Sequence, residues 1–170
     1  NIKISIREEI NIAIDAAFNE SAIDCDIDFE KSSVFKNHNF KQIYHSEEKS
    51  NIRFVDAISQ GLKQSLEKFD NLIFMGQDIA EYGGVFKISE GFVDQFGKDR
   101  IRNTPICESA IVSLALGLSV KGFKSVVEMQ FADFVSSGFN PIVNNLAKIH
   151  YRWGQCADVV VRMPCGAGVG

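Results

Sequence analysis

The sequence predicts an α/β fold in which helices cover both faces of a mostly parallel sheet, a three-layer α/β/α arrangement. Three observations lead to this prediction. Short apolar runs rich in β-branched residues recur along the chain, helical periodicities separate them, and glycine or proline marks the junctions. Strands buried on both faces give such continuous apolar runs, and crossover helices between parallel strands give the alternation.

Composition and charge narrow the class of protein. Among the 170 residues, 45% are hydrophobic and 24% are charged, with a formal net charge of −4. These values are typical of a globular protein, and the basic footprint of a nucleic-acid-binding protein is missing. The longest apolar stretch, 111–120, is too short and too interrupted to span a bilayer. Four cysteines without a C-x-x-C pair indicate reduced thiols, so we expect a cytoplasmic protein.

The N-terminal region differs from the rest of the chain in its pattern of apolar and polar residues. Apolar residues recur there at helical spacing and predict an amphipathic helix over about residues 3–19. The residues that set this spacing are Ile6, Ile10, Ala13, Ile14 and Ala17. Residues 20–49 show no clear period and are expected to form a linker, or an arm laid over another surface.

The chain is therefore divided into an N-terminal helix and linker, residues 1–50, and one α/β domain, residues 51–170. The glycine-rich run 166–170 resembles a loop cut through its middle. We therefore expect the α/β domain to be incomplete at its C-terminus.

The first elements of the α/β domain follow from simple periodicity. Apolar residues mark one face of a helix between residues 52 and 69. The apolar run 72–75 ends at Gly76, which is typical of a buried parallel strand. Residues 77–90 are expected to form a glycine-containing loop, and residues 101–103 a short strand. The apolar face of the helix consists of Phe54, Ala57, Ile58, Leu62, Leu66 and Phe69.

The later elements repeat the pattern. Residues 108–120 are helical by their period, and Gly122 is placed to stop that helix. Val126 and Val127 lie in the next predicted strand. The pair Asn140-Pro141 predicts the start of another helix, because Asn can cap a helix and Pro tolerates the first helical position. The run 159–161 predicts a further strand.

Ligands of open α/β sheets gather at the carboxyl ends of the strands. Three such ends are predicted here, at residues 76–78, 103–105 and 128–130. Pro105 disfavours helix at the preceding residue, so a turn occurs there and Glu108 falls in the first turn of the next helix. The helix dipole favours an acid at that position, so position alone does not assign a function to Glu108. The motifs of nicotinamide and P-loop sites are absent.

Between Ile52 and Val169 the chain resembles the beta subunit of the decarboxylating component of 2-oxoacid dehydrogenase complexes, above all its branched-chain type. Five segments in the family order carry this resemblance, which is more specific than any single short motif. They are 76–78 with 82–86, 96–97 with 100–101, 103–109, 128–134 and 161–164. Residues 1–30 resemble the closing helix of the family's alpha subunit, which would make the protein an alpha–beta fusion. The alternative is an unrelated N-terminal extension.

The resemblance implies a thiamine-diphosphate-binding fold, of which this chain supplies the pyrimidine domain. Glu108 matches the family's activating glutamate, whose carboxyl hydrogen-bonds the aminopyrimidine and favours the tautomer that deprotonates the thiazolium carbon. Phe134 matches an aromatic residue that stacks on the pyrimidine. Gln130 matches a polar lining residue, and Ile106 matches a backbone contact.

Metal ions and partners are implied in the same way. The G-D-G…N pattern of the diphosphate and magnesium half-site is absent, which assigns both groups to an alpha-type partner domain. The family's catalytic histidine lies just past the glycine run and matches none of the three histidines in the chain. The resemblance also implies a potassium ion held by backbone carbonyls of Ala157, Val159 and Val160.

The implied activity is oxidative decarboxylation of a 2-oxoacid with transfer of the acyl group to the lipoyl arm of a transacylase component. Branched-chain 2-oxoacids are the favoured substrates, with pyruvate and acetoin left open, and a homo- or hetero-oligomer is expected. The chain alone is expected to self-associate and to be inactive. Two alternatives are a noncatalytic α/β assembly domain and a transketolase-like enzyme, and the segment 76–86 speaks against the second.

Overall fold

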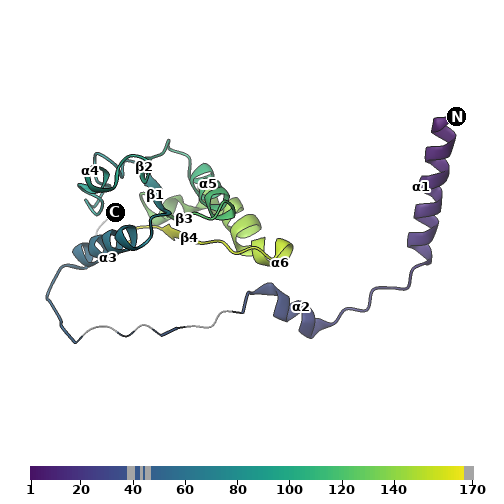
Figure 1. Cartoon of the computed structure of the whole chain (residues 1–170), viewed down its shortest axis with the longest axis horizontal. Helices are drawn as coiled ribbons and strands as arrows, with labels where there is room; N and C mark the ends of the chain where they lie inside the picture. The colour runs from purple at the N-terminus through teal and green to yellow at the C-terminus, as the bar shows by residue number, and fades with distance from the viewer. Residues whose placement is uncertain (38–40, 43, 45–46, 167–170) are drawn as a thin grey trace. The chain divides into compact units, whose positions relative to one another are not determined.

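The structure is a computed structural model that describes residues 1–37, 41–42, 44 and 47–166 (Figure 1). The chain divides into two compact units, Asn1–Ser33 and Val34–Gly170, and each is described by itself. Most of the glycine-rich run expected as a loop, residues 167–170, lies outside the described residues. No helix within the described ranges is long and apolar enough to cross a bilayer.

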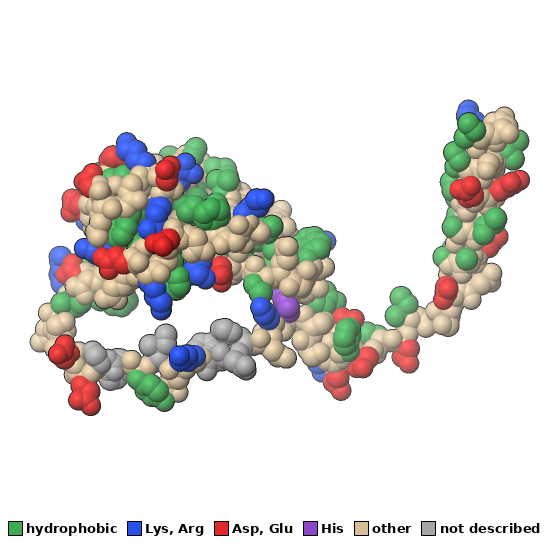
Figure 2. All heavy atoms as spheres, viewed as in Figure 1, with side chains coloured by type: hydrophobic (Ala, Val, Ile, Leu, Met, Phe, Trp, Pro, Cys, Tyr) green, Lys and Arg blue, Asp and Glu red, His purple; other side chains and the backbone are tan. Residues whose placement is uncertain are grey.

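The N-terminal unit contains the predicted amphipathic helix, and a helix that was not predicted begins in it. Helix α1 spans Ile2–Asn19, which confirms the periodicity, and its apolar side chains are exposed (Figure 2). Helix α2 spans Ile27–Val34, within the region expected to be a linker. Its start is stabilised by Asp26, whose Oδ1 accepts hydrogen bonds from the amides of Asp28 and Phe29, both at 3.0 Å. The signal for α2 was therefore a capping acid rather than a period.

Within the described residues, four parallel strands form one sheet. They are β1 (Leu72–Gly76), β2 (Ile101–Asn103), β3 (Lys124–Glu128) and β4 (Val159–Arg162), in the order β2-β1-β3-β4. Phe74 of β1 is in register with Ile101 of β2 and Val126 of β3. All four predicted strands are therefore confirmed, as is their parallel direction.

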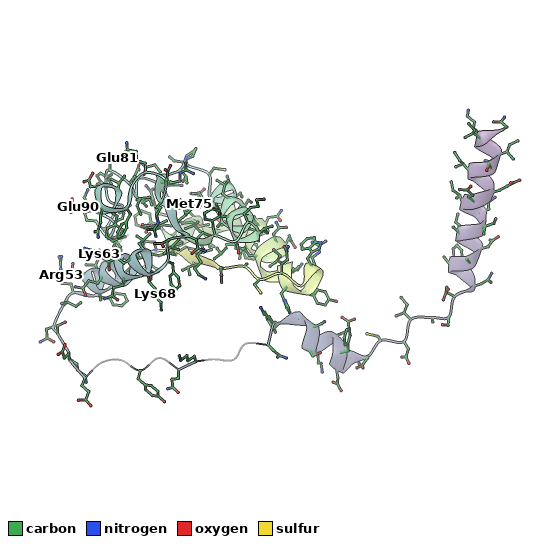
Figure 3. The ribbon with its side chains drawn as sticks, viewed as in Figure 1. Arg53, Lys63, Lys68, Met75, Glu81 and Glu90 are labelled. Carbon is green, nitrogen blue, oxygen red and sulfur yellow. The ribbon has the colours of Figure 1, made fainter. Side chains whose placement is uncertain are left out.

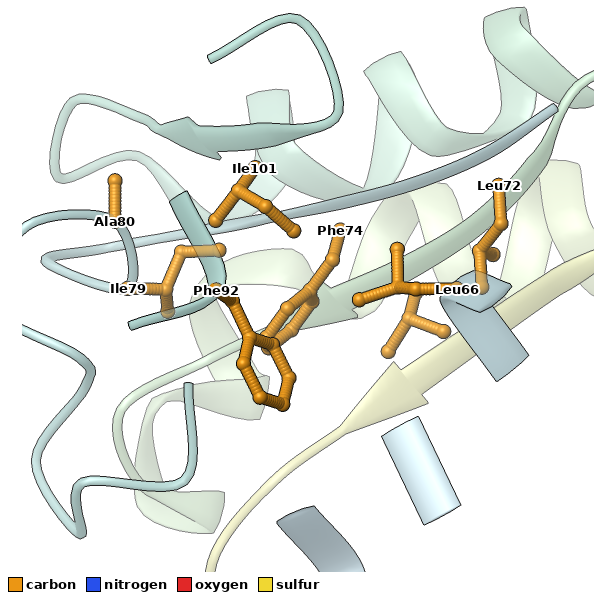
Figure 4. Packing of buried hydrophobic residues seen from close by; sticks show 8 residues of the cluster. Leu66, Leu72, Phe74, Ile79, Ala80, Phe92 and Ile101 are labelled. Atoms are coloured by element: carbon orange, nitrogen blue, oxygen red, sulfur yellow. The ribbon is translucent and has the colours of Figure 1, made fainter. Parts of the chain in front are cut away.

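Helices cover both faces of this sheet, as predicted. Successive residues of a strand point to opposite faces. Phe74 and Val126 therefore pack on the side of α3 (Phe54–Lys68) and α4 (Phe92–Phe96), while Met75 and Val127 pack on the side of α5 (Glu108–Val120). The α3 side contains the larger buried cluster, which consists of Leu66, Leu72, Phe74, Ile79, Ala80, Phe92, Ile101 and Val126 (Figure 4).

The exposed surface of α3 carries charged side chains, whereas the sheet beneath the helices is apolar. Lys63 and Lys68 of α3 are exposed, and Met75 of β1 is buried (Figure 3). Phe74 has no exposed surface. Burying such a side chain stabilises the fold by about 1.5–3 kcal/mol relative to leaving it in water. Apolar side chains of the strands, the helices and the loop after β1 are buried together and stabilise the fold together.

Arg100 closes the C-terminal end of α3. Its Nη2 donates to the carbonyls of Leu66 and Phe69, at 2.7 and 2.6 Å, and its Nε donates to the carbonyl of Leu72 at 3.1 Å. The last carbonyls of a helix lack partners within the helix, and the guanidinium supplies several donors in a fixed plane. One side chain therefore ties the end of α3 to the start of β1.

Substitution of Arg100 by lysine is expected to destabilise the fold by about 1–3 kcal/mol, because an ammonium cannot reach all three carbonyls and leaves some unsatisfied. Urea denaturation followed by circular dichroism measures this change. The matched control is Lys98→Met at the exposed ion pair with Glu81, which is expected to leave the denaturation midpoint unchanged. Equal midpoints for wild type and Arg100→Lys would contradict the expectation.

The chain between β3 and β4 departs from the prediction. A helix was expected to begin at Asn140, but the helical path begins earlier, at η1 (Ala132–Gly138). Asn140 has helical φ and ψ angles of −57° and −56° and makes no capping hydrogen bond. A capping residue needs an extended backbone, so a residue already inside a helical path cannot cap. The path continues through η2 (Pro141–Asn145), η3 (Leu146–Lys148) and α6 (Ile149–Trp153).

Candidate functional site

The three predicted strand ends meet at one edge of the sheet. Gly76, the last residue of β1, is in register with Asn103 of β2 on one side and with Glu128 of β3 on the other. A Cβ atom at Gly76 would lie 2.7 Å from the carbonyl oxygen of Glu128, so this approach requires glycine. The turns that follow these strands therefore present their side chains to the same region.

Glu108 begins α5 at this edge and is half-buried. Its Oε1 accepts a hydrogen bond from Nε2 of Gln77 at 3.2 Å. Gln77 is 3% exposed, so its amide is a fixed donor. The carboxyl group of Glu108 is thus held by the turn that follows β1 and does not extend freely into solvent.

Gln130 follows β3 and is also half-buried. Its Nε2 lies 3.4 Å from Oδ2 of Asp78, a long hydrogen bond. Asp78 directly follows Gln77 in the chain, so one turn contacts both Glu108 and Gln130. The structure therefore connects two predicted cofactor contacts that lie on separate elements.

Phe134 lies in η1 and is 41% exposed, which leaves ring surface open. Its ring meets Phe131 edge to face, with 6.0 Å between centroids, and Phe131 meets Phe86 in the same way at 6.2 Å. The hydroxyl of Ser109 donates to the carbonyl of Ser137, which ties η1 to the start of α5. Phe134 is therefore positioned on an element that is fastened beside Glu108.

The loop between β2 and α5 contains the fourth predicted contact. Ile106 is 83% exposed, and its predicted role involves the backbone rather than this side chain. The hydroxyl oxygen of Thr104 is buried and has no hydrogen-bond partner among the described residues. A buried hydroxyl without a partner is costly unless a ligand satisfies it, so Thr104 is an additional candidate contact that was not predicted.

Of the three predicted potassium ligands, Val159 and Val160 lie in β4 and Ala157 precedes it. Carbonyls of successive strand residues point to opposite sides. The amide of Ser125 donates to the carbonyl of Asp158 at 3.0 Å, so in β4 the carbonyl of Val160 also faces β3. The carbonyl of Val159 faces the opposite side. The two carbonyls thus face opposite sides of the strand, and the potassium ion stays a prediction.

Two charged residues that were not predicted as site residues form a buried ion pair at the same edge. Glu128 and Arg162 are in register at the ends of β3 and β4, with 2.6 Å between Oε2 and Nη1. Glu128 is 4% exposed. Burial raises the pKa of its carboxyl group, and the charge of Arg162 opposes that rise. The sequence signal was a charge directly after each apolar run, but pairing the two requires knowing that the strands are neighbours.

A cleft of about 630 Å³ opens beside this ion pair. It lies between the start of α3, the loop after β1 and the segment that follows β4. Its lining is mostly apolar and includes Phe54, Phe86, Phe131 and Met163, together with Arg162. Phe86 and Phe131, whose rings lead by edge-to-face contacts to Phe134, therefore also border this cleft.

Comparison with known proteins agrees with the resemblance drawn from the sequence. Residues 50–170 match the family described as transketolase, pyrimidine binding domain. The chain is 39% identical over 118 residues to the 2-oxoisovalerate dehydrogenase subunit beta of Bacillus subtilis. It is 41% identical over 117 residues to the pyruvate dehydrogenase E1 component subunit beta of Staphylococcus epidermidis and of Staphylococcus aureus. Each match covers 68% of this chain and 36% of the relative's length.

Proposed function

Because this chain belongs to the transketolase pyrimidine-binding domain family, we propose that it supplies the aminopyrimidine half of a thiamine diphosphate site. The observation that carries the proposal is Glu108, a half-buried carboxyl group held by the buried amide of Gln77 where β1 and β2 end. A preorganised acid at the carboxyl end of a parallel sheet suits a ligand that needs one fixed hydrogen-bond partner.

The residues at this edge fit the pyrimidine ring. Glu108 has a second carboxyl oxygen, Oε2, to hydrogen-bond a ring nitrogen and to hold or release a proton there. Phe134 offers exposed ring surface for stacking, and Gln130 offers an amide. When bound, thiamine diphosphate supplies a carbon nucleophile for a keto group and accommodates the electrons left by loss of carbon dioxide. In a site closed by a partner, these residues would orient the ring and exclude water from it.

The same residues do not fit magnesium. Within the described part of the chain, no three His, Cys, Asp or Glu side chains gather to hold a metal ion. Magnesium prefers carboxylates together with phosphate oxygens. We therefore assign magnesium and the diphosphate to an alpha-type diphosphate-binding partner domain. Residues 1–50 are proposed to be the end of such an alpha-like part, and a cytoplasmic location and potassium stay predictions.

For the whole protein we propose oxidative decarboxylation of a 2-oxoacid with acyl transfer to the lipoyl arm of a transacylase component. The support is the similarity to beta subunits whose names denote 2-oxoisovalerate dehydrogenase and pyruvate dehydrogenase. Branched-chain 2-oxoacids are the proposed substrates, and pyruvate is the competing one. The whole protein is proposed to be an oligomer.

The holoenzyme, assembled with its diphosphate-binding partner, is expected to release carbon dioxide from 2-oxoisovalerate and to acylate a free lipoyl domain. Both activities should depend on added thiamine diphosphate, because the cofactor supplies the nucleophile. Pyruvate in place of 2-oxoisovalerate tests the substrate preference. Transfer of ketol units to an aldehyde acceptor, without lipoyl acylation, would identify a transketolase-like enzyme instead. No thiamine diphosphate dependence in either assay would identify a noncatalytic assembly domain.

A further inference from the structure

The turn after β1 contacts two predicted cofactor residues from adjacent positions. Gln77 donates from Nε2 to Oε1 of Glu108 at 3.2 Å, and Asp78 accepts at Oδ2 from Nε2 of Gln130 at 3.4 Å. Glu108 follows β2 and Gln130 follows β3, the two neighbours of β1 in the sheet. The turn thus lies between the two elements and reaches both.

Asp78 has a backbone conformation that residues other than glycine rarely adopt. Its φ is +55°, in the left-handed region, which Asp and Asn tolerate better than most residues. Such strain persists where the surroundings over-determine it, and it gathers at functional sites.

Hydrogen bonds on both sides hold the turn around Asp78. Among them are Thr104 N to Gly76 O at 2.8 Å, Gly84 N to Asp78 O at 2.9 Å, Ser89 Oγ to Ile79 O at 2.6 Å and Ala80 N to Asn103 Oδ1 at 2.9 Å. Because the backbone is fastened on both sides of Asp78, the fold sets the directions in which the Gln77 and Asp78 side chains leave the backbone.

We propose that Gln77 and Asp78 are positioning residues that orient Glu108 and Gln130 toward the pyrimidine ring, a role that rests on the proposed function. The Gln77 amide occupies Oε1 of Glu108, so Oε2 is the oxygen left for the ring nitrogen. The Asp78 carboxylate only accepts hydrogen bonds, so the nitrogen end of the Gln130 amide faces it. The carbonyl oxygen of Gln130 is then free to accept from an amino group, which the aminopyrimidine carries.

The Gln77 part of the proposal is tested in the holoenzyme with Gln77→Met, which keeps the side-chain volume and removes the donor. Turnover is expected to fall about tenfold to hundredfold, the effect of losing one hydrogen bond to a charged acceptor, while the KM for the 2-oxoacid stays unchanged. Combining Gln77→Met with Glu108→Gln should give no further loss, because Gln77 acts through the Glu108 carboxyl group. Full additivity of the two substitutions would overturn the proposal for Gln77.

The Asp78 part is tested with two variants that both tolerate a positive φ. Asp78→Gly removes the carboxylate and is expected to raise the Kd for thiamine diphosphate about tenfold by titration calorimetry, as for one lost hydrogen bond. Asp78→Asn keeps an acceptor oxygen but can also turn its amide nitrogen toward Gln130, so it should lose less affinity than Asp78→Gly. Equal affinity in Asp78→Gly and wild type, or equal losses in both variants, would overturn the proposal for Asp78.

The experiments distinguish failure of the proposed function from failure of the positioning role of Gln77 and Asp78. A wild-type holoenzyme that neither binds thiamine diphosphate nor requires it would refute the proposed function itself. A wild-type enzyme that depends on the cofactor, together with variants at Gln77 and Asp78 that behave like wild type, would refute the positioning role alone.

Discussion

Replacement of Glu108 by glutamine is expected to lower thiamine-diphosphate-dependent turnover of the holoenzyme by about a hundredfold to a thousandfold, the loss typical of removing one preorganised group from a reacting centre. Glutamine keeps the shape of the side chain and an acceptor for the Gln77 amide, so the fold is expected to persist. What it loses is an oxygen that can hold and release a proton. The expected defect therefore concerns turnover rather than assembly.

Initial rates measured against thiamine diphosphate concentration test this expectation. The matched control is Glu90→Gln, the same chemical change at an exposed loop position, which should leave turnover unchanged. Wild-type turnover in Glu108→Gln, at saturating cofactor, would remove Glu108 from the site and with it the observation that carries the proposed function.

Replacement of Arg162 by methionine is expected to destabilise the fold by about 3–5 kcal/mol at neutral pH, the usual cost of leaving a buried charge without its partner. The Glu128 side chain is 5% exposed and that of Arg162 is 16% exposed, with 2.6 Å between them. The carboxyl group of Glu128 is therefore shielded from water and depends on the guanidinium for a partner. Glu128 must then either remain charged in an apolar environment or take up a proton.

The loss in Arg162→Met is expected to depend on pH. Burial already raises the pKa of Glu128 above its usual 4.5, and Arg162 is the group that opposes the rise. A carboxyl whose folded pKa is raised contributes stability that is fully present below the unfolded pKa and is lost as pH rises through the folded pKa. Without Arg162 the folded pKa rises further, so the destabilisation should be smallest near pH 4.5 and should grow toward neutral pH.

Urea denaturation at a series of pH values measures this dependence. The double variant Glu128→Gln with Arg162→Met removes both charges and is expected to recover much of the lost stability, because no unpaired charge is left behind. An Arg162→Met protein as stable as wild type at neutral pH would show that the ion pair does not stabilise the fold. A loss that does not vary with pH would show that it does not come from the charge of Glu128.

Local sequence patterns were sufficient to predict the longer helices and the most apolar strand. Helices α1, α3 and α5 were predicted because an amphipathic or apolar period repeats over several turns of one segment. Strand β1 was predicted because the apolar run 72–75 is continuous, and the structure buries all five residues of the strand. The short helices α2 and α4 were missed, since eight and five residues are too few to establish a period.

Asn140 shows where local reasoning fails. Asn before Pro is a good capping signal, but whether Asn140 caps depends on the conformation of the residues before it. The chain had already entered a helical path at Ala132, so Asn140 lies within that path and does not begin a new helix.

The sequence by itself determined the fold class and the strand ends where a ligand would gather, and its resemblance to a known family gave Glu108, Gln130 and Phe134 as predicted contacts. Only the tertiary structure decided that Gln77 holds Glu108, and that Glu128 pairs with Arg162. The physical reason is that Gln77 and Glu108 lie 31 positions apart in the chain. Periodicity and capping report on neighbours along the backbone, whereas these contacts arise from the order in which parallel strands lie side by side.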